Sequence, residues 1–455
     1  MLIVWEADIT GECRPGYGSA TSDEARPGLT WAAGTNSCEH SGVPGTFQSL
    51  RVRNFRLFVI GQLLSGTGTW MQGVAAPWLV LQLTGSGVAL GFDTSLQFLP
   101  ILLFGAWGGL VADRFDNRRI QLVTQVCYAL VAATLFGLVA THVVQLWMVY
   151  TLSFLSGCVT AIDMPTRQSF YLEMVGPDDL TNAMSLNTAT FTGARIVGPA
   201  IAGVLIGVFG TAPVFLINAI SYLAVVVALV SMRVGDLHPR EHAARAAGQI
   251  REGVRYVWRT PELRLPMALM AVVFLCAFNF MVLLPLLAVR TFHGRSSTYG
   301  VILSLFGLGS LVGALVMASR ARQPDSRRLA RLGVVLGAIA VGLALAPSLG
   351  VAWLLLPPLG AAGIAFAVAA NSTLQLTSTP QMRGRVMSLY TVVFLGSTPL
   401  GGPVAGWVGE HLGPRVGLAG GGVIAVAASA FALRVLQRVR SPARVLPSQL
   451  RYNDA

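Results

Sequence analysis

Met184-Ser-Leu-Asn-Thr188 recurs 203 residues later as Met387-Ser-Leu-Tyr-Thr391, and this repeat decides the predicted architecture. The same shift superposes flanking residues, namely Gly157 on Gly360, Pro177 on Pro380, Phe191 on Phe394, Gly193 on Gly396, Gly203 on Gly406 and Gly210 on Gly413. Single glycines recur by chance in glycine-rich helices, but the Met-Ser-Leu-x-Thr match with these neighbours indicates an internal duplication. The chain is therefore predicted to contain two related halves.

Composition places both halves in a membrane. Of the 455 residues, 54% are hydrophobic and only 11% are charged, whereas an ordinary soluble domain carries about 25% charged residues. Twelve apolar stretches are each long enough to supply the roughly 20 helical residues that cross a hydrocarbon core. They cover residues 57–83, 88–112, 120–140, 144–164, 183–209, 213–232, 265–289, 299–318, 332–349, 351–370, 386–408 and 416–433.

The repeat and the arginines together predict the topology. Because six stretches separate the repeated segments, both halves have the same orientation, which predicts an all-α integral membrane fold of 12 transmembrane helices in two parallel six-helix bundles. Eighteen arginines lie in the connections that follow even-numbered stretches, against three on the opposite side. Cytoplasmic loops are enriched in Arg, so both termini are predicted to face the cytoplasm, with the chain in the cell inner membrane.

The basic residues also exclude two classes of function. All 32 are Arg, and a Walker A phosphate loop needs a Lys, so ATP hydrolysis by that route is excluded. A net charge of +12 can indicate nucleic-acid binding, but these arginines lie in short loops between apolar stretches. Topology explains them better, and we expect the lipid bilayer to be the partner and no nucleic acid.

The sequence divides into five parts. Residues 1–50 are polar and rich in Gly, Ser and Pro, and are predicted to form a disordered cytoplasmic tail that insertion and transport do not need. The two bundles are expected at 51–232 and 265–437, with a cytoplasmic linker at 233–264 between them and a second tail at 438–455.

An amphipathic helix is predicted within the linker. Apolar Ile250, Val254, Val257 and Trp258 recur at helical spacing among polar residues. Such a pattern is typical of a helix lying on the inner membrane surface. A solvated linker helix would show the same pattern, and the sequence leaves both interpretations open.

Two motifs resemble the major facilitator superfamily. The loop Gly109-Leu-Val-Ala-Asp-Arg-Phe-Asp-Asn-Arg-Arg119 is similar to the family signature between helices 2 and 3, although Asp116 stands where the family usually has Gly. Gly193-Ala-Arg-Ile-Val-Gly-Pro-Ala-Ile-Ala-Gly203 looks like the Gly-Pro motif of the family's antiporters. Ser153 stands where many drug exporters of the family carry Arg.

The resemblance extends to one branch of that family. Gly68-Thr-Trp-Met-Gln72 and Asp163-Met-Pro-Thr-Arg-Gln168 are similar to the bacterial branch that contains the enterobactin exporter and macrolide and multidrug efflux proteins. The resemblance implies a secondary transporter in which two bundles rock about a central site. It also implies proton-driven export of a small amphipathic compound such as a drug, a macrolide or a siderophore.

The signature loop suggests a latch at the inner mouth. A carboxylate at Asp113, flanked by Arg114, Arg118 and Arg119, can interact with the positive end of a neighbouring helix. In the resembling fold the start of the eleventh stretch, with Arg385, is that neighbour. Alternatively, these charges only set the topology.

Four charged residues are candidates for coupling. Asp93 lies inside the second stretch, where an acid is costly to insert, but it is close enough to the outer end to touch water. Asp163 and Arg167 are four residues apart, so they form either a local ion pair or part of a gate. Arg195, near the middle of its stretch, should face a polar cavity or pair with an acid.

Further polar and aromatic residues are candidates for the substrate cavity, since helices 1, 4, 7 and 10 line it in the resembling family. They are Gln62, Trp70, Gln72, Gln97, Asn187, Asn279 and Asn371. Gln97 lies one turn from Asp93, so both should point the same way. Each residue could instead hold two helices together through a hydrogen bond.

The function predicted is therefore secondary transport of a small molecule, with no cofactor and no metal, by a protein that we expect to act as a monomer. Two other classes remain as alternatives. A membrane-embedded enzyme would need a catalytic motif, and neither HExxH nor GxSxG occurs. A receptor or scaffold without transport activity has the same sequence features, and only a flux measurement separates it from a transporter.

Overall fold

A computed structural model describes residues 48–238, 249–319 and 325–439. The predicted tails, 1–50 and 438–455, lie outside these residues except at their inner edges. The elements in chain order are η1 (Gln48–Arg51), α1 (Arg53–Thr84), α2 (Gly87–Arg114), α3 (Asn117–Ala140), α4 (Leu146–Phe209), α5 (Ala212–Val230), η2 (Val234–Asp236), α6 (Gln249–Arg259), α7 (Pro261–Ala277), α8 (Phe280–Leu286), the π-helical η3 (Leu287–Thr291), α9 (Ser296–Ser319), α10 (Ser326–Ala344), α11 (Leu349–Thr377), α12 (Pro380–His411) and α13 (Pro414–Val439). Every element in this part of the chain is helical, which confirms the all-α prediction.

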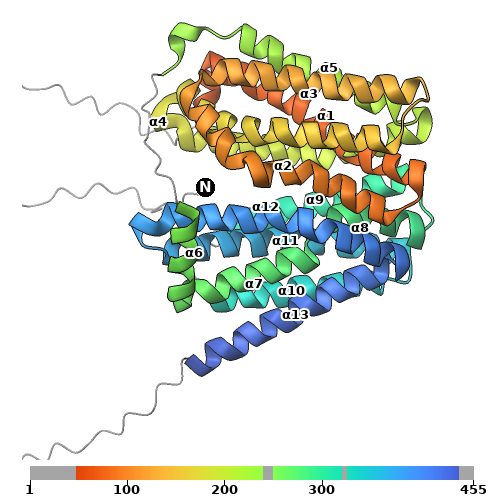
Figure 1. Ribbon diagram of the computed structural model, residues 1–455, viewed down its shortest axis with the longest axis vertical. Coiled ribbons are helices and arrows are strands. Elements are labelled where there is room, and N and C mark those ends of the chain that lie inside the picture. Colours follow the sequence, from red (N-terminus) through yellow and green to blue (C-terminus); the bar gives the residue numbers. More distant parts are fainter. Residues whose placement is uncertain (1–47, 239–248, 320–324, 440–455) are drawn as a thin grey trace, which may run out of the picture.

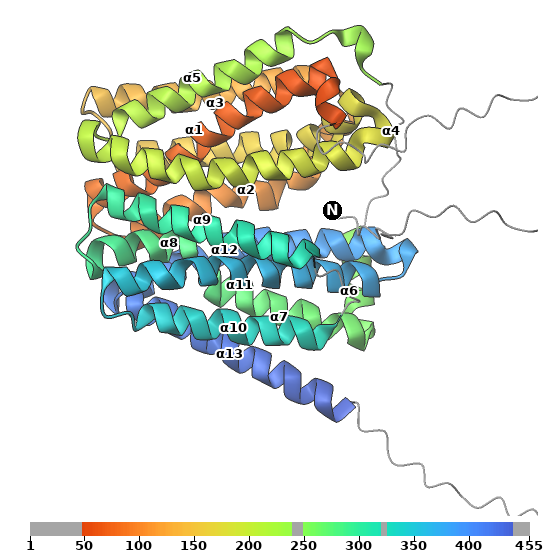
Figure 2. The same ribbon diagram turned by 180° about the vertical axis from the view of Figure 1, so that it is seen from behind.

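The helices lie in two groups. Figures 1 and 2 show α1 to α5 side by side on one side of the molecule and α7 to α13 on the other, and we call these the first and the second bundle. The end of the molecule that contains the turns at Gly85, Gly210 and Gly413 is called the turn end. The end that contains α6 and the start of α1 is called the linker end.

Three of the expected spans are not separate, uninterrupted helices. The 64-residue α4 turns back at Gly176, whose φ of 73° suits glycine, and so contains the fourth and fifth spans. The seventh span is broken between α7 and α8, where the Asn279 side chain donates to the Leu275 carbonyl at 2.7 Å. Among the described residues, eight helical segments are long and apolar enough to cross a membrane, and α1, α10 and α12 lie alongside them (Figure 1).

Within each bundle, the repeated glycines allow helices to pack closely. A Cβ atom at Gly157 would lie 2.3 Å from the carbonyl oxygen of Gln97, so α4 packs directly on the backbone of α2. At the equivalent Gly360, a Cβ atom would lie 2.0 Å from the carbonyl oxygen of Phe306, so α11 packs in the same way on α9. Larger residues would force these pairs apart. The duplication therefore preserves a packing contact.

The first seam between the bundles joins α2 to α12 near the turn end. The facing pairs are Gly87 with Gly406, Gly91 with Gly402 and Ser95 with Pro399. The Ser95 hydroxyl donates to the Pro399 carbonyl at 3.0 Å. Because residue 403 is a proline, the backbone N–H that would normally donate to that carbonyl is missing, and the serine supplies a donor.

The second seam, between α4 and α9, repeats the first. The facing pairs are Ser296 with Gly203, Gly300 with Pro199 and Ser304 with Ile196. The Ser304 hydroxyl donates to the Ile196 carbonyl at 3.0 Å, as Ser95 does to Pro399. Ile196 precedes Pro399 by the 203 residues of the repeat, so the two seams are equivalent by the internal symmetry.

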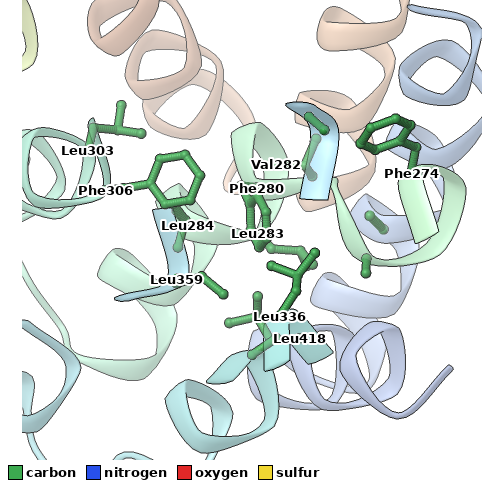
Figure 3. Packing of buried hydrophobic residues seen from close by; sticks show 14 of the residues in the cluster. Phe274, Phe280, Val282, Leu283, Leu284, Leu303, Phe306, Leu336, Leu359 and Leu418 are labelled. Carbon is green, nitrogen blue, oxygen red and sulfur yellow. The ribbon is translucent and has the colours of Figure 1, made fainter. Parts of the chain in front are cut away.

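A buried apolar core surrounds the broken seventh span. Figure 3 shows Phe280 and Leu283 of α8 among side chains from the neighbouring helices, including Phe306 of α9, Leu336 of α10 and Leu418 of α13. Each of these side chains is at most 5% exposed. The break in the seventh span therefore lies within the packed core of the second bundle.

Candidate functional site

A buried polar network lies inside the first bundle. Asp163 of α4 is 1% exposed, and its Oδ2 lies 3.0 Å from Arg167 Nη2. Arg167 Nη1 also donates to Gln62 Oε1 of α1 at 3.2 Å. The ion pair favoured by the four-residue spacing is therefore present, and it links two helices.

Three residues of α3 complete this network, and the sequence reading missed them. The side chains of Gln121, Thr124 and Gln125 donate to Asp163 Oδ1 at 3.1, 2.9 and 3.2 Å. All three are at most 4% exposed. Polar residues one turn apart in an otherwise apolar helix were the signal that could have revealed them. Burying a charge is costly unless it is paired and hydrogen-bonded. These three donors and Arg167 satisfy the Asp163 carboxylate and hold it in position.

Asp93 of α2 is buried, with 4% of its surface exposed, so the interpretation as a water-facing outer residue is wrong. Ser153 of α4 donates its hydroxyl to Asp93 Oδ1 at 2.6 Å. This serine occupies the position at which many exporters of the resembling family carry Arg. Gln97, expected on the same face, is exposed. Asp93 is therefore an isolated carboxyl held by a neutral donor.

Arg195 has aromatic rather than acidic neighbours. Its guanidinium carbon lies 5.3 Å from the ring centroid of Trp70 on α1 and 5.3 Å from that of Phe306 on α9. Among the described residues, no acid lies within ion-pair distance, so of the two alternatives for Arg195 the pairing with an acid is wrong. The two rings attract the cation through their π faces instead. Arg195 thus connects the two bundles.

Further aromatic side chains pack against one another in both bundles. Trp70 packs edge-on against Phe191 at 5.6 Å between centroids, and Phe274 of α7 packs in the same way on Phe394 at 4.9 Å. Tyr390 stacks on Phe394 and has a hydrogen bond with Asn371. Both bundles therefore contribute aromatic groups, and the first adds the charge of Arg195.

Three other cavity candidates are engaged within their own bundle. Gln72 accepts from Asn218 Nδ2 at 2.7 Å, and Asn187 accepts from the Tyr171 hydroxyl at 2.5 Å. Asn279 bonds its own helix and is 5% exposed. These contacts are the interhelical and local hydrogen bonds that the sequence left as the alternative.

At the linker end, the signature loop turns without the family's glycine at position 116. Asp116 has a φ of −61° and accepts from the Arg119 backbone N–H, so it caps α3. Arg118 Nε donates to the Leu229 carbonyl at 2.8 Å, and Arg114 is exposed. The substitution for glycine therefore creates no strain.

Arg385, the expected partner across the latch, binds the linker helix. Its guanidinium forms an ion pair with Glu252 of α6, and a Cβ atom at Gly253 would lie 3.0 Å from the Arg385 carbonyl oxygen. Val257 of α6 is 3% exposed, whereas Trp258 is 63% exposed. The amphipathic helix therefore buries one apolar side chain against the second bundle and leaves another uncovered.

A clasp at the turn end, absent from the sequence reading, joins the two bundles. Glu410 of α12 accepts from the Ser86 hydroxyl at 2.6 Å and from the Val88 backbone N–H at 2.8 Å. Arg290 of η3 donates to the carbonyls of Gly85 and Glu410 at 2.6 and 2.8 Å. The carboxylate thus caps α2 from the opposite bundle, and the helix dipole favours its charge.

The clasp is charged at neutral pH. Glu410 lies beyond the 386–408 apolar stretch, and the hydrogen bonds from Ser86 and Val88 hold its pKa below the ordinary value of 4.5. A lowered pKa means that the contribution of the carboxylate is complete above the ordinary value and is lost as the pH falls through the lowered one. The clasp therefore weakens only in acid.

Glu410→Gln is expected to open the turn end more often, since the amide keeps the shape but loses the charge. With a reporter cysteine at buried Ala405, labelling by an impermeant thiol reagent should accelerate up to about tenfold, equivalent to 1.4 kcal/mol. Glu262→Gln, at an exposed acid of the linker end, is the matched control. Equal labelling rates in the parent, in Glu410→Gln and in Glu262→Gln would show that the clasp does not stabilise the closed turn end.

Comparison with known proteins identifies similar chains. Residues 44–453 match the model of the family described as "Transmembrane secretion effector". The chain is 28% identical to the "Multidrug efflux pump Tap" of Mycolicibacterium fortuitum, over 78% of this chain and 90% of that protein. It is 26% identical to the "Staphyloferrin A transporter" of Staphylococcus aureus, over 58% of this chain and 66% of that relative, slightly less than two thirds.

The fold has solved counterparts as well. A bacterial homologue of the human lysosomal transporter Spinster, in an inward-facing and unoccupied conformation, matches with a TM-score of 0.68. The match covers 88% of this chain and all of that one, at 14% sequence identity. At that identity the likeness concerns the fold alone.

Proposed function

Because the chain belongs to the transmembrane secretion effector family of major facilitator transporters, we propose that it exports small amphipathic organic compounds in exchange for protons. Membership of the family confirms the resemblance and the two-bundle membrane fold, and it identifies a transporter rather than an enzyme. The relatives are efflux proteins and a staphyloferrin transporter. A drug or a siderophore is the cargo class that these relatives suggest, and the sequence resemblance adds a macrolide.

The observation that carries this proposal is the asymmetry of the interface between the bundles. Near the turn end, both seams are closed by backbone contacts and serine hydrogen bonds. Toward the linker end, Phe191 is 55% exposed, and no described atom lies within 4 Å of a Cβ built at Gly384. Such an interface suits alternating access, in which bundles 51–232 and 265–437 rock about the level of Arg195.

The proposed orientation has the linker end and both termini in the cytoplasm. The arginine distribution supports it, and so does α6, whose exposed Trp258 suits a helix at the inner membrane surface. In this orientation the closed turn end faces outward. Asp113 then remains the proposed inner latch, while the pair of Arg385 with Glu252 adds the linker helix to the same mouth.

The test is flux in inverted membrane vesicles that contain the chain, acting as a monomer in this proposal. We expect at least one member of a panel of antibiotics, macrolides and siderophores to accumulate while a proton gradient is present, and to stop when a protonophore collapses it. Vesicles without the chain are the control. Flux that ignores the gradient would contradict proton coupling, and a folded protein without any flux would favour a receptor or scaffold.

A further inference from the structure

We propose that Arg195 is the anion-binding group of the cargo site, so that the cargo carries a carboxylate or a similar planar anion beside an aromatic or apolar body. This inference names the cargo class of the proposed transporter and rests on that proposal. Four observations on Arg195 support it. The side chain has no acidic partner among the described residues, it lies between two aromatic rings, it has no counterpart in the internal repeat, and it lies where the interface between the bundles becomes exposed.

The guanidinium has no acidic partner in the described part of the chain. Its neighbours are the faces of Trp70 and Phe306, which attract a cation but accept no strong hydrogen bond. Two acids buried in the first bundle have other partners: Asp93 bonds Ser153, and Asp163 pairs with Arg167. An Arg in the middle of a membrane helix is costly and usually functional. Its five N–H donors match a carboxylate, which can bind in a bidentate way.

The internal symmetry is broken at this residue. The shift of 203 residues superposes Arg195 on Thr398, although Phe191, one turn away, has its counterpart in Phe394. The seam residue Gly203 likewise has its counterpart in Gly406, whereas the charge has none. If Arg195 served the packing between bundles, the equivalent first seam, in which Thr398 takes this position, would not be built without it. A cation that is present in only one of the two halves suits a ligand that is itself asymmetric.

Arg195 also lies where the interface changes from closed to exposed. On its turn-end side, Gly198 and Gly203 are buried against Trp70 and Gly300. On its linker-end side, Phe191 is 55% exposed on the same face of the helix. An anion can therefore approach the guanidinium from the linker end, while its apolar body contacts Trp70 and Phe191. When the seams open, the same group would face the turn end.

The test is thermal unfolding of the full chain, purified in detergent, with 2-naphthoate or the neutral 2-naphthamide as probe. We expect naphthoate, not naphthamide, to raise the unfolding temperature in a concentration-dependent way, because a ligand that binds the folded state stabilises it. Arg195→Gln should weaken the apparent Kd for naphthoate at least about tenfold. Arg264→Gln, at an exposed arginine of α7, should leave the response unchanged.

Arg195→Lys provides a second variant, which keeps the charge but not the planar fork, and should give an intermediate Kd. An undiminished naphthoate response in either Arg195 variant, or equal responses to naphthoate and naphthamide in the parent, would overturn the anion site. Binding needs no gradient and no flux. Loss of vesicle transport with an intact, Arg195-dependent naphthoate response would therefore contradict the proposed function and leave this inference standing.

Discussion

Asp93→Asn is expected to leave the protein folded and inserted but to reduce proton-driven efflux by about tenfold or more, the effect of 1.4 kcal/mol or more on the rate-limiting step. The reason lies in the pairing of Asp93 with Ser153. An asparagine oxygen can still accept the Ser153 hydroxyl at the observed 2.6 Å, so the local packing survives. An amide cannot bind and release a proton within the transport cycle, however, and a carboxyl group can.

The measurement is flux in inverted vesicles, with the imposed pH gradient and the amount of inserted protein held equal. Ser153→Ala is the matched control, since it removes the hydrogen bond and leaves the carboxyl group. If the carboxyl group is the coupling element, Ser153→Ala should retain coupled flux with a changed pH profile. Gradient-driven flux at the parental rate in Asp93→Asn would show that Asp93 serves only the packing of α2 on α4.

Asp163→Asn is expected to destabilise the folded protein by about 2–4 kcal/mol. Removing one partner of a fully buried ion pair typically costs roughly 3–5 kcal/mol. The estimate here is lower because the Arg167 side chain is 33% exposed and solvent screens its charge. The hydrogen bonds from α3 add to the loss, since a neutral amide accepts them more weakly than a carboxylate.

Two comparisons make this prediction specific. Asp116→Asn breaks the ion pair with Arg119, which has the same local character but exposed side chains, 50% and 83%, and should cost less than about 1 kcal/mol. The double variant Asp163→Asn with Arg167→Gln should cost less than the sum of the single ones, because no unpaired charge remains. Denaturant unfolding in mixed micelles measures all of these. Equal losses for Asp163→Asn and Asp116→Asn would contradict the estimate.

Part of the candidate site could be predicted from sequence because it is local. Asp163 and Arg167 are one helical turn apart, and any helix brings them together. The partner of Asp93 could not be found in this way. Ser153 lies 60 residues further along the chain on another helix, and helices that are apolar nearly all round give no periodic signal of which faces meet.

The sequence by itself determined the all-helical membrane fold, the two related halves and the family. Membrane insertion depends on the length and hydrophobicity of each segment, and the repeat needs only an alignment of the chain with itself. The tertiary structure alone decided that Arg195 lies between Trp70 and Phe306, and that Glu410 caps a helix start 324 residues earlier in the chain. In a membrane, the hydrophobic effect does not select which helices associate. Their partners depend on the close fit of small residues such as Gly87 and Gly406, and that fit exists only once the bundles are packed.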